Sequence, residues 1–277
     1  MKGGVQHHHA HIAACMAEHG VAGPVLGVAC DGTGYGADGT VWGCEVLVSS
    51  YDDYVRAAHL DYVPLPGGEQ AIRQPWRMAA VYLDRQGLLS ADIEFCRRLD
   101  TDSWRVLKQM IEKDINCPLA SSAGRLFSAV SALVGLCPVE AYESQSAIML
   151  EAAATEAEGA YSYEIVQDND VLIMQPGPMF HEIVNDLQAG TALGQISARF
   201  HNTFVQMLAD TVEQVADETG ISQVALSGGT FQNELVLTGL HQELAEAGFA
   251  VLIHRETPPN DGGMALGQAV VAAARNR

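Results

Sequence analysis

The chain has 277 residues, 48% of them hydrophobic, which is enough to bury a sizeable core in one large domain or two small ones. Its 34 acidic and 15 basic residues give a formal net charge of −19, which repels nucleic-acid phosphates. No apolar run approaches the roughly 20 residues that a membrane helix needs. We therefore expect a soluble protein whose partners include neither nucleic acid nor a membrane.

Six cysteines are scattered along the chain, and none of them forms a CxxC pair. No signal peptide precedes them, so we expect neither a disulfide framework nor a zinc ribbon, and we predict a cytoplasmic location. Most of these thiols are best interpreted as small buried hydrophobic groups. The six are Cys15, Cys30, Cys44, Cys96, Cys117 and Cys137.

The N-terminal part of the chain predicts one helix followed by strands. Residues 11–20, HIAACMAEHG, are typical of a short helix that ends at a glycine. Residues 25–30, VLGVAC, and the stretch from Val41, VWGCEVLVSS, predict a β-hairpin with a glycine-rich loop over 32–39. Residues 54–65, YVRAAHLDYVPL, predict a third strand.

A helical insertion is predicted over residues 67–159. After the Pro- and Gly-rich stretch PLPGG, the apolar residues follow a helical period. Residues 161–166, YSYEIV, and 171–176, VLIMQP, then predict two short strands. Helices are expected near 180–187 and over 193–218.

The last 60 or so residues alternate between strands and helices. Residues 223–229, QVALSGG, and 249–254, FAVLIH, predict strands, whereas 230–248 and 262–276 predict helices. This alternation implies parallel strands covered by helices, which is an α/β layer.

Histidines near the N-terminus form a candidate metal site. His7 and His11 are four residues apart, so both side chains lie on one face of a helix and can bind one ion. Asp31 and Asp261 each follow a predicted strand, where loops converge above an α/β sheet. These four nitrogen and oxygen ligands suit Fe(II), Zn or Mn. On the residues alone, a tag remnant or a solvated helix start stays open, although Ala10 interrupts the histidine run.

Two glycine-rich turns are candidate phosphate sites. LSGGTFQN, residues 226–233, places Gly228 and Gly229 between a buried strand and a helix N-terminus, whose free N–H groups can face a phosphate. DGTGYG, residues 31–36, is either a similar anion loop or a plain hairpin loop. The chain has no G-x-S-x-G and no Walker lysine loop, which argues against common hydrolases and P-loop enzymes. His201 is interpreted as a satisfied interior group.

Seven stretches, in one order along nearly the whole chain, resemble the HypF family, the carbamoyltransferases of [NiFe]-hydrogenase maturation. They are VQHHHAHIAA, DGTGYGADGTVWG, PLPGGEQAIRQPWRMA, SSAGRLF, ARFHNTF, LSGGTFQNELVL and PPNDGGMALGQA. PWRMA and SSAGRLF distinguish this family from the related TsaD tRNA threonylcarbamoyltransferases.

The resemblance implies an α/β ASKHA fold, shared with actin and sugar kinases, in which two RNase-H-like lobes close around a nucleotide. It implies that residues 1–277 form one TsaD-like module with the first lobe largely absent. The expected parts are a metal-binding helix over 1–20, an RNase-H-like lobe over 21–66 and 160–277, and the helical insertion over 67–159.

The resemblance also assigns site residues. It carries the family's metal ligands onto His7, His11, Asp31 and Asp261, for one divalent transition metal, Zn or Fe. It implies binding of ATP or carbamoyl adenylate, with Mg²⁺ as an additional candidate ion, and it names no catalytic side chain. Ser128 stands where relatives usually have Asp, and this predicts a lower nucleotide affinity if that Asp touches the ribose. The nucleotide-binding residues implied are Gly32, Gly34, Gly124, Ser128, Gly228, Gly229 and Asn233.

The function that the resemblance implies is transfer of a carbamoyl group from carbamoyl adenylate to the C-terminal cysteine thiol of HypE. That thiocarbamate becomes a cyanide ligand of the hydrogenase iron. In HypF proteins a YrdC-like adenylating domain and most of the first lobe precede the histidine motif, so we expect this chain to be a fragment or a reduced relative. Two alternatives stay open: a docking module without catalysis, and a small-molecule O-carbamoyltransferase.

Overall fold

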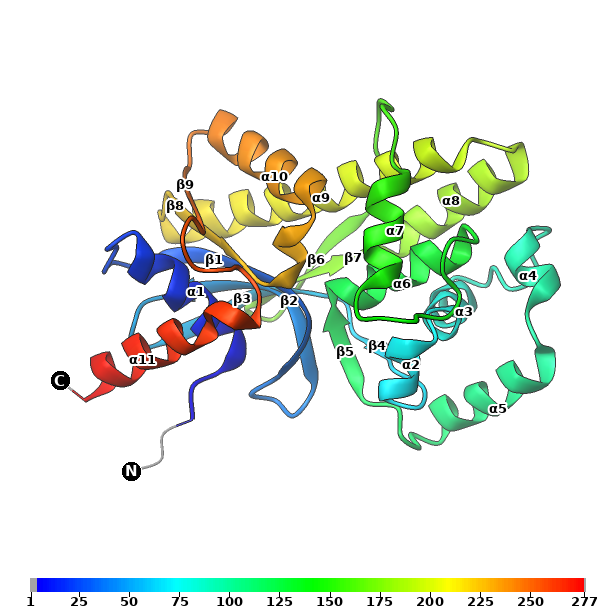
Figure 1. The fold of residues 1–277 in the computed structure, drawn as a ribbon, viewed down its shortest axis with the longest axis horizontal. Helices are drawn as coiled ribbons and strands as arrows, with labels where there is room; N and C mark the ends of the chain where they lie inside the picture. The colour runs from blue at the N-terminus through cyan, green and yellow to red at the C-terminus, as the bar shows by residue number, and fades with distance from the viewer. Residues whose placement is uncertain (1–3, 277) are drawn as a thin grey trace.

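Strands from opposite ends of the chain lie side by side in one mixed sheet (Figure 1). The computed structural model describes residues 4–276. The strands follow the order β6-β7-β3-β2-β1-β8-β9, and β5 pairs with both β2 and β4 beside this path. They are β1 (Val25–Tyr35), β2 (Val41–Ser49), β3 (Tyr54–Leu60), β4 (Val63–Pro64), β5 (Leu119–Ser122), β6 (Glu164–Asp168), β7 (Val171–Gln175), β8 (Gln223–Ser227) and β9 (Ala250–Ile253).

Parallel pairing at the centre of the sheet brings the two candidate loops together. β1 is antiparallel to β2 but parallel to β8, and β8 is parallel to β9. Ala29 of β1 lies opposite Ser227 of β8, so Asp31 and Gly228, which follow them, emerge at the same edge. The predicted α/β layer of parallel strands is therefore present, within a sheet of mixed direction.

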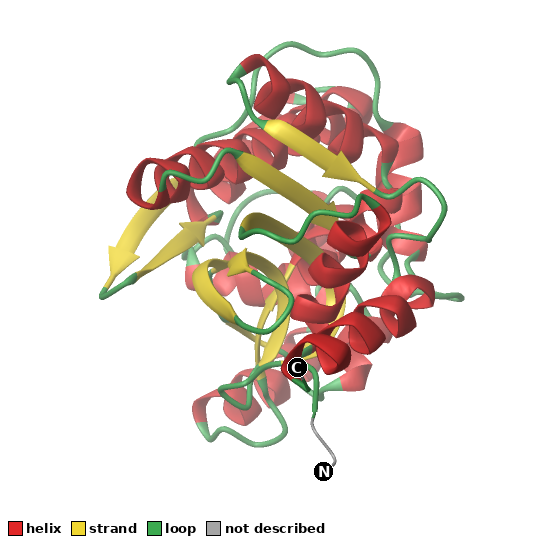
Figure 2. Cartoon of the chain, turned by 90° about the vertical axis from the view of Figure 1, so that its left-hand side faces the viewer, coloured by secondary structure: helices red, strands yellow, loops and turns green. Residues whose placement is uncertain are grey.

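Helices cover both faces of this sheet (Figure 2). α1 lies on one face and α11 packs against α1, whereas α6, α9 and α10 lie on the other side. Within residues 4–276, no helix combines the length and apolar composition that crossing a membrane requires. The helices are α1 (His7–Glu18), α2 (Glu69–Arg73), α3 (Trp76–Arg85), α4 (Glu94–Arg98), α5 (Thr101–Glu112), α6 (Ala123–Leu133), α7 (Gln145–Ala153), α8 (Gly177–Ala189), α9 (Leu193–Thr219), α10 (Glu234–Glu246) and α11 (Met264–Arg275), with 3₁₀ turns η1 (Gly229–Gln232) and η2 (Asp261–Gly263).

The segment over 67–159 is not wholly helical, which corrects the sequence prediction. β5 pairs in parallel with β2 and antiparallel with β4. Its four residues, LASS, are too few to show a period and follow directly after Pro118. This strand is defined by its partners, which are far away in the sequence. The predicted third strand over 54–65 is likewise divided, into β3 and β4.

The glycine loop predicted over 32–39 is also shorter than expected, because β1 continues to Tyr35. The pairing changes register between Cys30↔Cys44 and Gly34↔Trp42. Residues 31–33 therefore bulge opposite Gly43. Bulges of this kind redirect side chains and are frequent beside functional sites. Here the bulge turns Asp31 out of the regular ladder.

α1 and α11 approach each other through a glycine. A Cβ atom added at Gly267 of α11 would lie 1.8 Å from the carbonyl oxygen of Ala10 in α1. No side chain fits at this distance, so the two helix backbones are in direct contact.

We expect Gly267→Ala to destabilise the fold by about 1–3 kcal/mol, because the two helices must separate. In an ordinary helix interior the same change stabilises by roughly 0.5–1 kcal/mol, so the sign of the effect is the test. Urea denaturation would measure it. Gly23→Ala is the control, since no atom lies within 4 Å of its added Cβ. A stabilised Gly267→Ala variant would contradict the close packing.

Candidate metal and nucleotide site

Four predicted ligands converge at the edge where β1 and β8 end. α1 begins at His7 because the Gln6 side chain caps it by accepting the N–H of His9 at 2.8 Å. His7 and His11 lie one turn apart on α1 and face Asp31 of the β1 bulge. Asp261 begins η2, the turn that leads into α11.

The distances between the donor atoms suit a single metal ion. His7 Nε2 lies 3.1 Å from Asp31 Oδ2 and 3.5 Å from Asp261 Oδ1, and His11 Nε2 lies 3.2 and 3.3 Å from the same two oxygens. The two Nε2 atoms are 3.2 Å apart, and one ligand atom from each of the four residues lies within 4.8 Å of the others. In a tetrahedral zinc site, bonds of about 2.0–2.1 Å give ligand–ligand separations of roughly 3.3–3.4 Å.

Charge and burial also favour a cation here. Burial raises the pKa of Asp31, but its contacts with His11 and His7 and the N–H of Gly32 outweigh this effect and lower the pKa well below its usual value. The Asp31 carboxylate is therefore ionised. The side chain of His11 is 1% exposed, whereas that of Asp261 is 71% exposed, so the site is closed by α1 and open beside Asp261. Two imidazoles and two carboxylates in this arrangement fit a divalent transition metal.

Residues that the sequence did not single out hold these ligands in place. Ser227 Oγ lies 3.5 Å from His11 Nδ1 and 2.8 Å from His254 Nε2. Glu18, at the end of α1, accepts the N–H groups of Arg255 and Glu256 at 2.5 and 2.7 Å. Burial raises the pKa of Glu18, but hydrogen bonds, first that of the Thr257 hydroxyl, lower it to about 2. Glu18 thus ties α1 to the loop that leads to Asp261.

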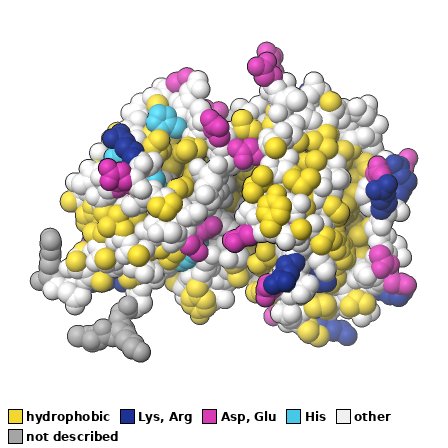
Figure 3. Space-filling model, in the orientation of Figure 1, with side chains coloured by type: hydrophobic (Ala, Val, Ile, Leu, Met, Phe, Trp, Pro, Cys, Tyr) yellow, Lys and Arg dark blue, Asp and Glu magenta, His cyan; other side chains and the backbone are white. Residues whose placement is uncertain are grey.

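A cavity of about 310 Å³ adjoins the metal ligands, between α6, α7 and η1. Figure 3 shows this face of the molecule hollowed between its two halves, with acidic side chains near the hollow. Several residues predicted to bind nucleotide line the cavity. These are Gly32, Gly124, Ser128, Gly229 and Asn233.

Gly34 and Gly228, which were also predicted to bind nucleotide, do not line this cavity. A Cβ atom at Gly34 would lie 2.5 Å from the His8 ring, so this glycine lets α1 lie against β1. Gly228 has a φ of +107°, and its added Cβ would lie 2.1 Å from the carbonyl oxygen of Cys30. Both glycines permit close backbone packing beneath the site, and neither lines the cavity.

One carboxylate of the metal ligands contacts residues that line the cavity. Asp31 Oδ2 faces the two histidines, whereas Oδ1 accepts the N–H of Gly32 at 2.7 Å. A Cβ atom at Gly229 would lie 3.0 Å from the same Oδ1. A ligand in the cavity and an ion at the histidines would therefore be neighbours.

His201 positions one wall of the cavity. Asn233 caps α10 by accepting the N–H of Val236 at 3.1 Å, and its Nδ2 donates to His201 Nε2 at 3.0 Å. His201 Nδ1 in turn donates to the Ser197 carbonyl at 2.8 Å. Burial lowers the pKa of His201 to about 4. The interior histidine is thus neutral, and it orients Asn233.

The hydroxyl of Ser128 is hydrogen-bonded within the protein. Its hydroxyl donates to the Gly124 carbonyl at 2.8 Å and lies 2.9 Å from the hydroxyl of Ser146. The residue is 1% exposed.

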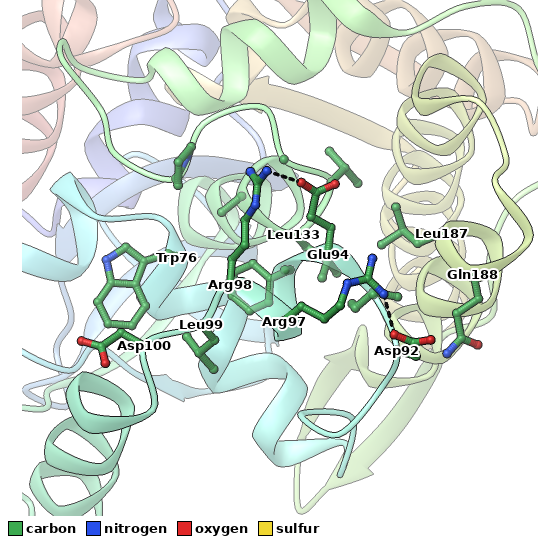
Figure 4. Close-up of a pocket in the computed structure, with 16 residues that line it drawn as sticks. Trp76, Asp92, Glu94, Arg97, Arg98, Leu99, Asp100, Leu133, Leu187 and Gln188 are labelled. Carbon is green, nitrogen blue, oxygen red and sulfur yellow. Dashed lines mark hydrogen bonds and ion pairs between the residues drawn. The ribbon is translucent and has the colours of Figure 1, made fainter.

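A larger cavity of about 780 Å³ lies at the other end of the molecule, beside α4 and the ends of α6 and α8 (Figure 4). Its arginines are paired with neighbouring carboxylates: Arg97 Nη1 lies 2.5 Å from Asp92, and Arg98 Nη2 lies 2.6 Å from Glu94. None of the predicted metal or nucleotide residues lines it. The smaller cavity beside Asp31 is therefore the better candidate site.

Comparisons with known proteins identify the family of the chain. The family model for the carbamoyltransferase Kae1-like domain, second subdomain, matches residues 27–268. The chain is 39% identical over 279 residues to a carbamoyltransferase HypF homologue of Cupriavidus necator, covering 97% of this chain and 70% of that protein. It is 40% identical over 276 residues to carbamoyltransferase HypF of Rhodobacter capsulatus, covering 98% of this chain and 36% of that protein.

Solved structures show the same fold. A crystal structure of full-length HypF in the phosphate- and nucleotide-bound form matches with a TM-score of 0.93 at 42% identity, covering 98% of this chain and 42% of that one. The HypF structure from T. kodakarensis matches with a TM-score of 0.83 at 33% identity, covering 96% of this chain and 36% of that one.

The fold therefore defines a Kae1-like α/β domain with a candidate His₂Asp₂ metal site. The chain belongs to the HypF carbamoyltransferase family, where it corresponds to the second subdomain of the Kae1-like domain. This confirms the resemblance seen in the sequence. The chain spans about a third of the length of several curated relatives, 36% in the R. capsulatus protein.

We expect the double variant His7→Ala/His11→Ala to lose the bound metal, because two of the four ligands are removed. Elemental analysis of the dialysed proteins would measure it, with about one equivalent expected for the unmodified chain. His181→Ala, which removes an exposed histidine on α8, is the control. Equal metal content in the double variant and the control would rule out this site.

Stability should fall as the pH is lowered from about 6.5 to about 4, because His201 stays neutral in the fold but binds a proton when unfolded. A pKa of about 4 against the usual 6.5 corresponds to a loss on the order of 3 kcal/mol across this window. Urea denaturation at several pH values should show a smaller loss for His201→Gln than for the unmodified chain. If the free energy of unfolding of His201→Gln falls with pH as steeply as that of the unmodified chain, His201 is not the group that causes the loss.

Proposed function

We propose that this chain performs the carbamoyl-transfer step of HypF. It would move the carbamoyl group of carbamoyl adenylate to the C-terminal cysteine thiol of HypE, during synthesis of the cyanide ligands of [NiFe]-hydrogenase. The observation that carries the proposal is Asp31, whose Oδ2 faces His7 and whose Oδ1 accepts the N–H of Gly32 in the cavity wall. Membership of the family and the nucleotide-bound form of a relative support it.

We also propose that the sheet and its helices form one RNase-H-like lobe of an ASKHA fold. In longer HypF proteins a YrdC-like domain would supply the adenylate. The mixed sheet, with its central parallel pair β1 and β8, supports this assignment. The cavity walls would then hold the nucleotide from one side.

The metal would be held by His7, His11, Asp31 and Asp261. When bound, it would supply positive charge that neutralises phosphate and polarises an attached oxygen. The backbone at Gly32 and Gly229 can approach a phosphate closely, because neither residue carries a side chain. His201 holds Asn233 in one orientation at the cavity wall.

The transfer itself needs no nucleophile from this chain. The thiolate of HypE would attack the carbamoyl carbon, so that a C–S bond forms while the bond to the phosphate oxygen breaks and AMP leaves. Cys30 and Cys44, on β1 and β2, are fully buried with their Sγ atoms 2.9 Å apart, so they are not accessible to substrate. Positioning and preorganised charge would supply most of the rate enhancement.

To test this proposal, the chain would be given pre-made carbamoyl adenylate and HypE. We expect HypE to gain the mass of one carbamoyl group, detected by mass spectrometry, and HypE lacking its C-terminal cysteine to stay unmodified. Asp31→Asn should lower the rate by at least about 100-fold, because it weakens both sites. His181→Ala should leave the rate unchanged. If the unmodified chain does not modify HypE, a docking role without catalysis replaces the proposal.

A further inference from the structure

Arg125, in the first turn of α6, is a buried cation with two unpaired N–H donors among the described residues. The residue is 5% exposed, and neither its Nε nor its Nη1 has a hydrogen-bond partner among residues 4–276. Over the same part of the chain, no ion pair joins its guanidinium to a carboxylate. Buried charges in folded proteins are normally paired and hydrogen-bonded.

Arg56 shows how this fold treats another largely buried arginine. Its Nε donates to the buried Glu45 carboxylate at 2.6 Å, and its Nη1 donates to the Tyr62 hydroxyl at 2.6 Å. Its guanidinium also stacks on Trp42, 4.0 Å from the ring centre. The guanidinium of Arg56 is therefore bound by side chains of the protein, whereas Nε and Nη1 of Arg125 have no hydrogen-bond partner among residues 4–276.

The position of Arg125 within α6 adds a second unfavourable effect. Ser122 caps the helix by accepting the Arg125 N–H at 3.1 Å, so Arg125 is the third helical residue. Positive side chains are disfavoured in the first turn, where the helix dipole is itself positive. Burial also lowers the pKa of Arg125. An arginine that breaks both rules is typical of a functional position rather than a structural one.

Arg125 lines the same cavity as Gly32 and Gly124. Two carboxylates near this cavity each accept hydrogen bonds from other residues through one oxygen. Glu140 Oε1 accepts the hydroxyl and the N–H of Ser146, and Glu151 Oε1 accepts the N–H of Glu234 at 2.7 Å. Glu140 is near enough to favour the charged form of Arg125, but among residues 4–276 it accepts no hydrogen bond from the guanidinium, so Nε and Nη1 are free to bind an anionic ligand.

We propose that Arg125 binds a phosphate oxygen of the molecule that occupies this cavity. The guanidinium matches phosphate geometry through parallel N–H donors, and the positive end of α6 lies beside it. This inference rests on the proposed function, to which it adds the residue that recognises the anionic part of the nucleotide. The same chemistry would also hold inorganic phosphate.

The test compares Arg125→Met with the unmodified chain by calorimetric titration of ADP, adenosine and inorganic phosphate. We expect Arg125→Met to bind ADP about 10- to 100-fold more weakly and adenosine equally well. Ligand-free thermal stability is the second readout. Arg125→Met should melt at the same temperature or higher, because an apolar side chain replaces an unpaired buried charge.

Arg85→Met is the matched control, because Arg85 is paired, with its Nη2 donating to Asp61 at 2.8 Å. It should bind all three ligands normally and should not melt at a higher temperature than the unmodified chain.

Equal ADP and phosphate affinities in Arg125→Met and the unmodified chain would overturn the proposal, and so would a lower melting temperature with unchanged ligand binding. If the unmodified chain binds phosphate but not ADP, and Arg125→Met binds neither, the phosphate-binding role of Arg125 is supported. The proposal that the cavity binds a nucleotide is then contradicted. If the unmodified chain binds neither ADP nor phosphate, the proposal is also overturned.

Discussion

The close approach of α1 to its neighbours is the contact on which both candidate sites depend. A Cβ atom at Gly27 of β1 would lie 2.5 Å from Ile12, and one at Gly34 would lie 2.7 Å from His7. On the opposite side, Gly267 lets α11 reach the α1 backbone. α1 is thus held between glycine-bearing surfaces. Any added side chain there would move the histidines away from Asp31, whose other oxygen accepts the N–H of Gly32 in the cavity wall.

The features that the sequence predicted well are those with a local signature. Two histidines four residues apart share a helix face, and Asp31 follows a buried strand, so their meeting follows from periodicity and topology. The alternation of strands and helices after residue 220 defines the parallel layer for the same reason. The family resemblance added Gly124 and Ser128, for which residue pattern alone gives no signal.

The features that could not be predicted depend on partners distant in the chain. β5 exists because β2 and β4 lie beside it, and the bulge at Asp31 follows from the register of the whole β1–β2 pair. Ser227 and Glu18 support the metal ligands through contacts with the loop after β9. The burial of Arg125 has no counterpart in the sequence pattern, since arginine in a first helical turn predicts an exposed side chain.

Asp261 and the histidines of α1 come from opposite ends of the chain, and this has a consequence for assembly. An ion shared by them would act as a cross-link that closes a loop nearly as long as the molecule. Such a link mainly restricts the unfolded chain, and its effect grows slowly with loop length. The ligand set is also complete only after the last strand and loop have been synthesised. Metal capture would therefore follow the synthesis of β9 and Asp261, and it would fix α1 against the loop before α11.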